Sequence, residues 1–287
     1  MWDVVLLDEK WFNADKDCRK EYLLEGEEVP RRACKSKGFI TKVMFLCAVA
    51  RPQMDIGVDE KIGLWPFVSQ SRARRSSRNR PAGSMVITTL INVDATTYRD
   101  YVLNKVVPAI KASLPCVSKR VVLQHDNATP HRSVDDDALA GVSTDGWTFV
   151  VRRQPPNSPD LNVLDLGFFA SIQSLQHKMV SRTVDDVISS TLMVFDMLSG
   201  EKLEDLFLTY IAGSHAPIPE HAGDNHFKLP HLKKDGMRRA GTLAVNLTVL
   251  VSLLFEANSP PTVDIPVTIL TNEMHSFLTC PITDFPR

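Results

Sequence analysis

The stretch QPPNSPDLNVLDLGFF, residues 154–169, decides how this chain folds. Its prolines end any helix that precedes it, and the step Ser158-Pro159-Asp160 is typical of a helix start. The apolar residues that follow recur at the spacing of one helical face: Leu161, Leu164, Phe168, Ile172, Leu175 and Met179. We therefore predict a helix that begins near residue 158 and packs on a core.

Asp165 shares the edge of this apolar face, because it lies four residues after Leu161 and three before Phe168. A carboxylate at such a place is costly unless something compensates it, for example a metal ion. Asp160, in contrast, fits a helix-start residue better than a ligand. The position of Asp165 directs attention to other acidic residues at the ends of apolar strands.

Two apolar strands elsewhere in the chain each lead into an aspartate. Residues 4–7 form a continuous apolar run that reaches Asp8, and residues 120–124 lead to Asp126. An amphipathic helix expected over residues 94–114, with Asp94 or Thr96 as its cap, lies between them. This order favours a crossover that sets the two strands parallel and side by side.

The remaining elements are expected to complete a mixed α/β domain. Pro66 favours an edge position for the third strand. The expected strands are residues 41–50, 63–68 and 147–151, and the expected helices are a solvated one around residues 135–137 and two at 184–199 and 202–211.

Three aspartates on two strand ends and one helix can bring hard oxygen ligands to one point. Mg²⁺ and Mn²⁺ prefer such ligands, and two ions about 3.5–4 Å apart clamp the oxygens of a phosphoryl transfer. The residues alone do not decide between this metal chemistry and an ordinary role of the aspartates in capping turns. A zinc site at His125 and His131 is disfavoured, because no Cys or His pair completes a tetrahedral set.

The overall composition is that of a soluble globular protein, with 287 residues, 44% hydrophobic, 23% charged and a formal net charge of −1. An anionic partner must therefore be met by a local basic patch. The five cysteines form no CxxC pair and are expected to be reduced thiols of an intracellular protein. The N-terminus does not have the pattern of a signal peptide, and the most apolar late segment, about 16 residues long, is too short to span a bilayer.

Residues 69–81, SQSRARRSSRNRP, hold five arginines among serines. The ordinary interpretation is a solvated, mobile loop. The functional alternatives are contact with phosphates or nuclear targeting, because arginine matches phosphate geometry.

The segments VVLLDEKWF, VVLQHDNATPH and QPPNSPDLNVLDLGFF resemble the three catalytic blocks of mariner-like transposases, above all the plant and oomycete branch whose third acid is aspartate. RARRSSRNRPAGS and HFKLPHLKKDGMRR also resemble that branch, so the similarity covers residues 3–239. The resemblance implies an RNase-H-like fold, a mixed sheet flanked by helices. It also implies that Asp8, Asp126 and Asp165 are catalytic metal ligands, with Asn127 and His131 near the site.

The resemblance further implies what the protein does and with what. The expected activity is DNA strand cleavage and transfer with Mg²⁺ or Mn²⁺, as two ions, and the expected partners are DNA (transposon ends and target) and a second copy in a homodimer. Neither a membrane nor a small-molecule cofactor is expected, and the nucleus is the expected location. The expected nucleic-acid-binding residues are Arg72, Arg74, Arg75, Arg78 and Arg80.

We expect residues 1–212 to form the catalytic domain, 213–240 a basic family-like segment, and 241–287 a divergent, poorly ordered tail. Two features depart from the family: no helix-turn-helix modules precede the first catalytic strand, and 38 residues separate Asp126 from Asp165, one fewer than usual in this branch. The alternative function is therefore an inactive, truncated transposase remnant that acts at most in nucleic-acid binding or as an interaction protein.

Overall fold

The computed structural model describes residues 2–15, 26–28, 37–52, 61–78, 80–114, 119–155, 158–215 and 233–241. A five-stranded mixed sheet lies at its centre, in the order β3-β2-β1-β6-β7. The strands are β1 (Val4–Asn13), β2 (Lys42–Ala50), β3 (Lys61–Pro66), β6 (Arg120–His125) and β7 (Thr148–Arg153).

The sheet combines an antiparallel half with a parallel half. β1 pairs antiparallel with β2 and β2 with β3, whereas β1 pairs parallel with β6 and β6 with β7. The predicted parallel neighbourhood of the first strand and the strand before Asp126 is confirmed. β3 is an edge strand, as Pro66 predicted.

β1 differs from its prediction, because it does not end before Asp8. It continues for ten residues to Asn13, and every residue from Val5 onward is paired with β2. Asp8 therefore lies in the middle of a strand, and the prediction that it sits at a carboxyl end is wrong. The apolar run ends at Leu7, but the backbone groups of the residues beyond Asp8 are satisfied by the ladder to β2.

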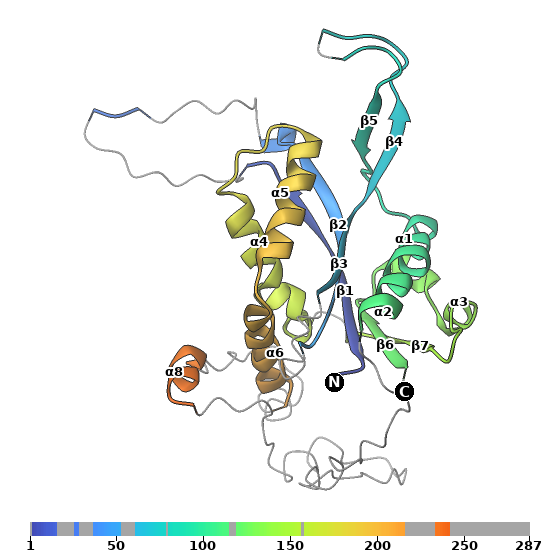
Figure 1. Cartoon of the computed structure of the whole chain (residues 1–287), viewed down its shortest axis with the longest axis vertical. Helices are drawn as coiled ribbons and strands as arrows, with labels where there is room; N and C mark the ends of the chain where they lie inside the picture. Colours follow the sequence, from blue (N-terminus) through green and yellow to red (C-terminus); the bar gives the residue numbers. More distant parts are fainter. Residues whose placement is uncertain are drawn as a thin grey trace, which may run out of the picture.

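Helices cover both faces of the sheet (Figure 1). One face carries α1 (Ala95–Tyr101), a π-helical segment (Val102–Val106), α2 (Val107–Ser113) and α3 (Asp136–Ala140). The other face carries η6 (Leu164–Phe168, π-helical), α4 (Phe169–Gln176), α5 (Val184–Met197) and α6 (Gly200–His215). Short 3-10 turns are η1 (Lys37–Phe39), η4 (Thr129–Ser133) and η5 (Pro159–Leu161).

The alternating side chains of β1 contribute to both cores. Val4, Leu6 and Phe12 pack under the layer of η6, α4, α5 and α6, whereas Val5 and Leu7 pack under the layer of α1 and α2. Because successive strand residues point to opposite faces, Asp8 shares the face of Leu6 and Glu9 shares the face of Leu7. Two neighbouring acids of the sequence are thus divided between the two faces.

The predicted helix of the opening stretch begins later than expected. Pro159–Leu161 is only a 3-10 turn, and the side chain of Ser158 makes no capping hydrogen bond. The helix starts beyond it, where the Oδ1 of Asn162 accepts a hydrogen bond from the backbone N–H of Leu164 at 3.0 Å. The apolar face is confirmed, since Leu164, Phe168 and Ile172 are fully buried.

The arginine-rich segment is not simply a loop, because β4 (Val68–Arg72) pairs antiparallel with β5 (Met85–Thr89) in a separate two-stranded sheet. The expectation of a loop over residues 69–81 is wrong for the strand residues. The sequence of β4, VSQSR, does not alternate between apolar and polar residues, so it does not predict a strand that packs one face on a core. In Figure 1 the two strands project beyond the body of the molecule.

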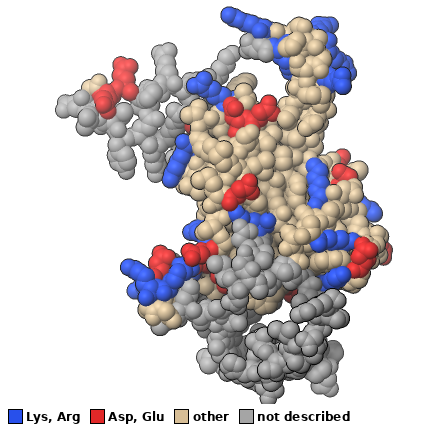
Figure 2. Space-filling view, in the orientation of Figure 1, with Lys and Arg blue, Asp and Glu red and all other residues tan. Residues whose placement is uncertain are grey.

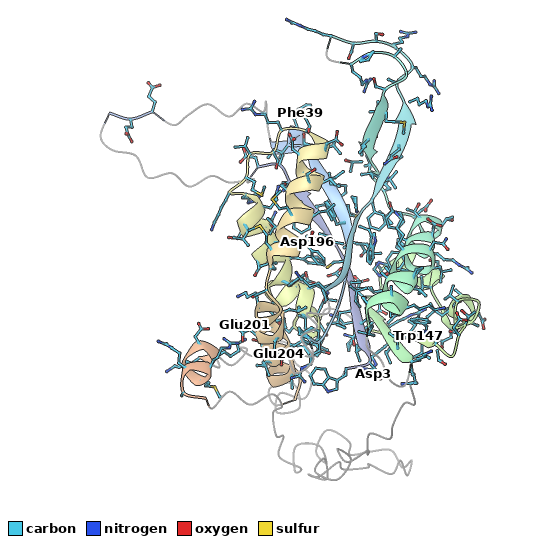
Figure 3. All side chains as sticks on the ribbon, viewed as in Figure 1. Asp3, Phe39, Trp147, Asp196, Glu201 and Glu204 are labelled. Atoms are coloured by element: carbon cyan, nitrogen blue, oxygen red, sulfur yellow. The ribbon has the colours of Figure 1, made fainter. Side chains whose placement is uncertain are left out.

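A final short helix, α8 (Lys234–Arg239), contacts α6, the helix that carries the labelled Glu201 and Glu204 in Figure 3. Arg238 pairs with Asp205 at 2.6 Å, and Lys234 donates to the Asp205 carbonyl and to the Thr209 hydroxyl. Most of the expected segment 213–240 and the expected tail from residue 242 onward lie outside the described residues, as do Cys18, Cys34, Cys116 and Cys280. Cys47 is free and buried. Within the described part, no helix is both long and apolar enough to cross a membrane.

Candidate active site

The three aspartates come from three separate elements that meet at one place on the sheet. The β1–β6 register pairs Leu6 with Gln124, and two more residues along each strand bring Asp8 level with Asp126. Asp165 lies in η6, which packs over the same face through Leu164 and Phe168. The predicted positions of Asp126 after a strand and of Asp165 on a helix are confirmed.

Asp8 is the most strongly perturbed of the three. Its pKa is raised to about 8 by burial, then by the like charges of Asp165 and Glu9, and to a smaller extent by that of Asp126. A hydrogen bond from its neighbour's backbone N–H, 2.7 Å long, opposes this rise. Burial, together with the neighbouring negative charges, therefore raises the pKa of Asp8 enough to keep a proton on it near neutral pH.

Asn162 connects this aspartate to the helix that carries Asp165. Its Nδ2 donates to the Oδ2 of Asp8 at 2.6 Å, while its Oδ1 accepts from the N–H of Leu164. One buried amide thus both orients the carboxylate and fixes the start of η6. Asn162 was not predicted as a site residue, although it lies within residues 154–169, because its role depends on Asp8, which is distant in the sequence.

Asp165 is exposed, so the argument that its burial demands compensation does not hold as stated. Its pKa is nevertheless raised, because nearby atoms displace part of its water and Asp126 adds a like charge, whereas Lys10 and a hydrogen bond with Asp8 lower it. Gly167, two residues later, has a φ of 158° and departs from helical geometry. A Cβ there would meet Leu206 Cδ2 at 3.0 Å, so glycine also permits close packing of η6 on α6.

Asp126 is held by a histidine rather than by the other aspartates. The Nδ1 of His131 lies 2.5 Å from Asp126 Oδ1, and its Nε2 lies 3.0 Å from Glu9 Oε1. The hydrogen bond with His131 is the largest cause that lowers the pKa of Asp126. Its side chain is half exposed and therefore remains an ionised carboxylate open to solvent.

His131 itself is buried and positively charged. Burial alone would lower its pKa, but the bonds to Asp126 and Glu9 outweigh this and raise it to about 10. Its ring stacks on Tyr98 with centroids 4.1 Å apart. His125, in contrast, is neutral, because burial and the charge of His131 lower its pKa to about 4. The sequence analysis missed Glu9, although strand alternation after Asp8 places it on the face of His131.

Asn127 takes part in the frame of the site. Its Nδ2 donates to the carbonyl oxygen of Gln154 at 2.5 Å, which connects the end of β6 to the start of the opening stretch. Gln124 makes a second connection, from its Nε2 to the Leu161 carbonyl at 3.1 Å. Two distant sequence blocks are therefore joined by side-chain hydrogen bonds next to Asp126.

The donor type of this site fits a divalent cation, because three carboxylates supply hard oxygen ligands, and burial and like charges raise the pKa of Asp8. In their present arrangement, no three His, Cys, Asp or Glu side chains of the described residues are grouped closely enough to hold an ion. Asp126 is instead engaged by His131. The residue types match a metal site, and the side chains are not assembled into one.

Solved structures share this architecture. The Mos1 mariner paired end complex with Mn superposes with a TM-score of 0.51 at 18% sequence identity, and the complex with Mg with a TM-score of 0.50 at 19%. Each match covers 79% of this chain and 57% of the solved chain.

The fold is that of the Mos1 mariner transposase catalytic domain. The predicted RNase-H-like class is thereby confirmed. At this level of identity the mariner likeness establishes the fold alone, and the chain spans just over half the length of the mariner chains it matches. No protein-family model and no curated protein matches the chain.

The five predicted arginines lie away from the aspartates, on and beyond β4. Arg72 ends the strand, and the others follow at the tip of the hairpin. All are exposed except Arg80, which is half-buried. The structure therefore brings the arginines together with one another and separates them from the acidic site.

Proposed function

We propose that this chain is a transposase-type catalytic domain that cuts and joins DNA strands with a divalent metal, and that Asp8, Asp126 and Asp165 are the metal ligands. The observation that carries the proposal is the meeting of three aspartates from β1, the end of β6 and η6 on an RNase-H-like sheet. The mutual effect of these carboxylates on the pKa of Asp8 supports it.

Mg²⁺ or Mn²⁺, as two ions, supplies charge neutralisation and Lewis acidity when bound. The protein's own groups prepare the ligands. Asn162 orients the carboxylate of Asp8, and Lys10 offsets part of the charge at Asp165. His131 keeps Asp126 ionised and therefore available as a ligand.

DNA is the proposed partner, as transposon ends and target, and a homodimer is the proposed assembly. The similar Mos1 structures are paired end complexes with Mn and with Mg, which supports both the partner and the metals. Action on DNA in the nucleus is part of the same proposal. Because the solved chains are covered to 57%, the activity of a whole transposase is proposed and not carried over.

The test is nicking of supercoiled plasmid by the purified chain with Mg²⁺ or Mn²⁺. Asp165→Asn removes one ligand at an exposed position and should lower the nicking rate by at least about 100-fold. Asp160→Asn, in the same stretch but outside the site, is the matched control and should cut at the wild-type rate. Equal nicking by the wild type and Asp165→Asn would overturn the assignment.

A second candidate is a nucleic-acid-binding protein that does not cut. Two observations favour it: the absence of an assembled three-ligand group among the described residues, and the engagement of Asp126 by His131. DNA binding by the wild type, without nicking under any divalent metal, would select this candidate.

A further inference from the structure

The hairpin of β4 and β5, together with the tip between them (residues 68–89, the arm), concentrates positive charge. Residues 61–93 contain the five arginines and no aspartate or glutamate. The whole chain has a formal charge of −1, so without these five arginines it would carry −6. Figure 2 shows the blue of Lys and Arg gathered at the end of the arm, outside the body of the protein.

The arginines are not used to hold the arm together. None of the five forms an ion pair with a described residue, and the Nε of Arg80 is buried without a hydrogen-bond partner in the described part of the chain. The tip is instead ordered by its backbone, since Ala73 and Ser77 bond to Ser84 and Arg80 across the hairpin. Four of the five guanidinium groups, all but that of the half-buried Arg80, are thus displayed on a hydrogen-bonded frame and left available for an external anion.

The base of the arm is anchored in the core. Phe67, directly before β4, is fully buried, and the centroid of its ring lies 4.4 Å from the ring centroid of Tyr101. The Tyr101 hydroxyl donates to the Pro66 carbonyl at 2.9 Å, and Leu90 N–H donates to the Phe67 carbonyl at 3.0 Å. The arm therefore leaves the sheet at a fixed point. Its distance from the aspartates can be worked out from the pairing of the strands.

Asp8 pairs with Cys47, and Cys47 pairs with Leu64, so Asp8 and Leu64 are level across the sheet. Arg72 follows Leu64 by eight residues. At about 3.3 Å per strand residue, Arg72 lies up to about 26 Å from the level of Asp8, and the other arginines lie further out. One turn of B-form DNA is about 34 Å long.

We propose that the arm enters a groove of duplex DNA about one helical turn from the phosphodiester on which Asp8, Asp126 and Asp165 act. A two-stranded ribbon fits the major groove, and arginines match the phosphates on its rims. The distance from the cut rests on the function proposed above, whereas binding of DNA by the arm does not.

Duplex DNA fits this surface better than an acidic protein does. Met85 is the large apolar side chain exposed on the two described strands of the arm, at 57%. A stable protein interface has a buried apolar centre and about 800 Å² on each partner. Arginines and serines make up most of the exposed residues of the arm, which suits a phosphate backbone.

Binding to a 30-base-pair duplex in EDTA, over a series of salt concentrations, tests the arm without any cutting. Replacement of all five arginines by glutamine should weaken binding at least about 10-fold near 0.1 M salt and reduce the salt slope by three or more, because each lost phosphate contact removes about 0.9. The pair Arg74→Gln and Arg75→Gln should reduce the slope by about two.

The matched control is Arg99→Gln with Arg182→Gln, which removes two exposed cations outside the arm and should change the slope by less than one. Thermal unfolding verifies that each variant is folded, and the two-residue arm variant gives the same test if the fivefold variant is not. A wild-type slope in the folded arm variants overturns the proposal, and so does an equal loss in the control.

The distance is tested by metal-dependent nicking of duplexes whose flank on one side of the nick is progressively shortened. Wild-type nicking should fall when the flank drops below about ten base pairs, and the fivefold variant should not respond to flank length. A response at a clearly different length overturns the placement. If the wild type nicks no duplex, the proposed cutting function and the placement both fail, and the salt slope still decides whether the arm binds DNA.

Discussion

The acidic site and the arm are built on opposite principles. The aspartates lie on long, paired elements against two cores, and their carboxylates are restrained by Asn162 and His131. The arginines lie on a ribbon outside both cores, with guanidinium groups that contact no acid of the described chain. The proposed metal ligands are thus restrained by neighbouring side chains, whereas the arginines proposed to contact phosphates carry no such restraint.

The largest expected difference concerns stability. Phe168 is fully buried beneath the site, and its ring centroid lies 6.0 Å from that of Phe195. Phe168→Ala should therefore lower the free energy of unfolding by about 3–5 kcal/mol. Ile87→Ala, on the half-buried arm strand, should cost less than about 1.5 kcal/mol. Urea unfolding measures both, and comparable costs would show that the arm belongs to the core.

The buried carboxylate of Asp8 should make the stability of the fold depend on pH. The folded-state pKa of Asp8, about 8, is above its ordinary value of 3.8, so the folded state holds a proton that unfolding releases. Stability should therefore fall as pH rises from about 4 to about 8. Asp8→Asn should be more stable than the wild type by about 2 kcal/mol at pH 8 without metal, after allowance for solvent screening.

The same variant gives the metal test. Mg²⁺ should raise the melting temperature of the wild type, because a cation relieves the crowding of carboxylates, and should leave Asp8→Asn nearly unchanged. Two outcomes would argue against the charge crowding. One is that Asp8→Asn is less stable than the wild type at pH 8. The other is that Mg²⁺ raises the melting temperature of Asp8→Asn as much as that of the wild type. The arm variants should respond to Mg²⁺ as the wild type does.

A smaller effect is expected at the histidine. The raised pKa of His131, about 10, means that its bonds to Asp126 and Glu9 stabilise the fold fully below about pH 6.5 and are lost as pH rises through 10. Glu9→Gln should cost about 1–2 kcal/mol at pH 7, and this difference should shrink above pH 10. Unfolding measured from pH 6 to 11 tests this, and a constant difference would contradict the charged pair.

The smallest effect should come from the arm. Replacement of its five arginines by glutamine should change the free energy of unfolding by less than about 0.5 kcal/mol, because four of them are exposed and none forms an ion pair with a described residue. Calorimetric melting checks this. A large loss would mean that the arginines are part of the frame and would remove the contrast with the aspartates.

Sequence patterns predicted the parts of the molecule whose side chains meet a core. The run from Leu164 to Ile172 gave the helix face, and the apolar strand before Asp126 was found where it lies. The start of that helix was missed, because an amide two residues ahead, Asn162, replaces the serine that normally caps. The orientation of Asn162 depends on its hydrogen bond to Asp8, which lies far away in the sequence.

The length of β1 and the existence of the arm were not predictable in the same way. Residues 8–13 are a strand because β2 pairs with them, and β4 is a strand because β5 pairs with it. Their own sequences are mostly charged or polar and carry no clean alternation. For the site, the sequence pointed to the three aspartates but not to Glu9, whose role depends on a histidine more than a hundred residues away.

The division of Asp8 and Glu9 between the two faces of β1 has a consequence for errors in the gene. A single-residue insertion or deletion before Asp8 would exchange the two acids, so that a longer glutamate faced η6 and the aspartate faced His131. The same shift would move the fully buried Phe12 out of its core and bring Trp11 to that face. Such a change should therefore lower stability as well as displace both acids, whereas an insertion at the tip of the arm would lie outside both cores.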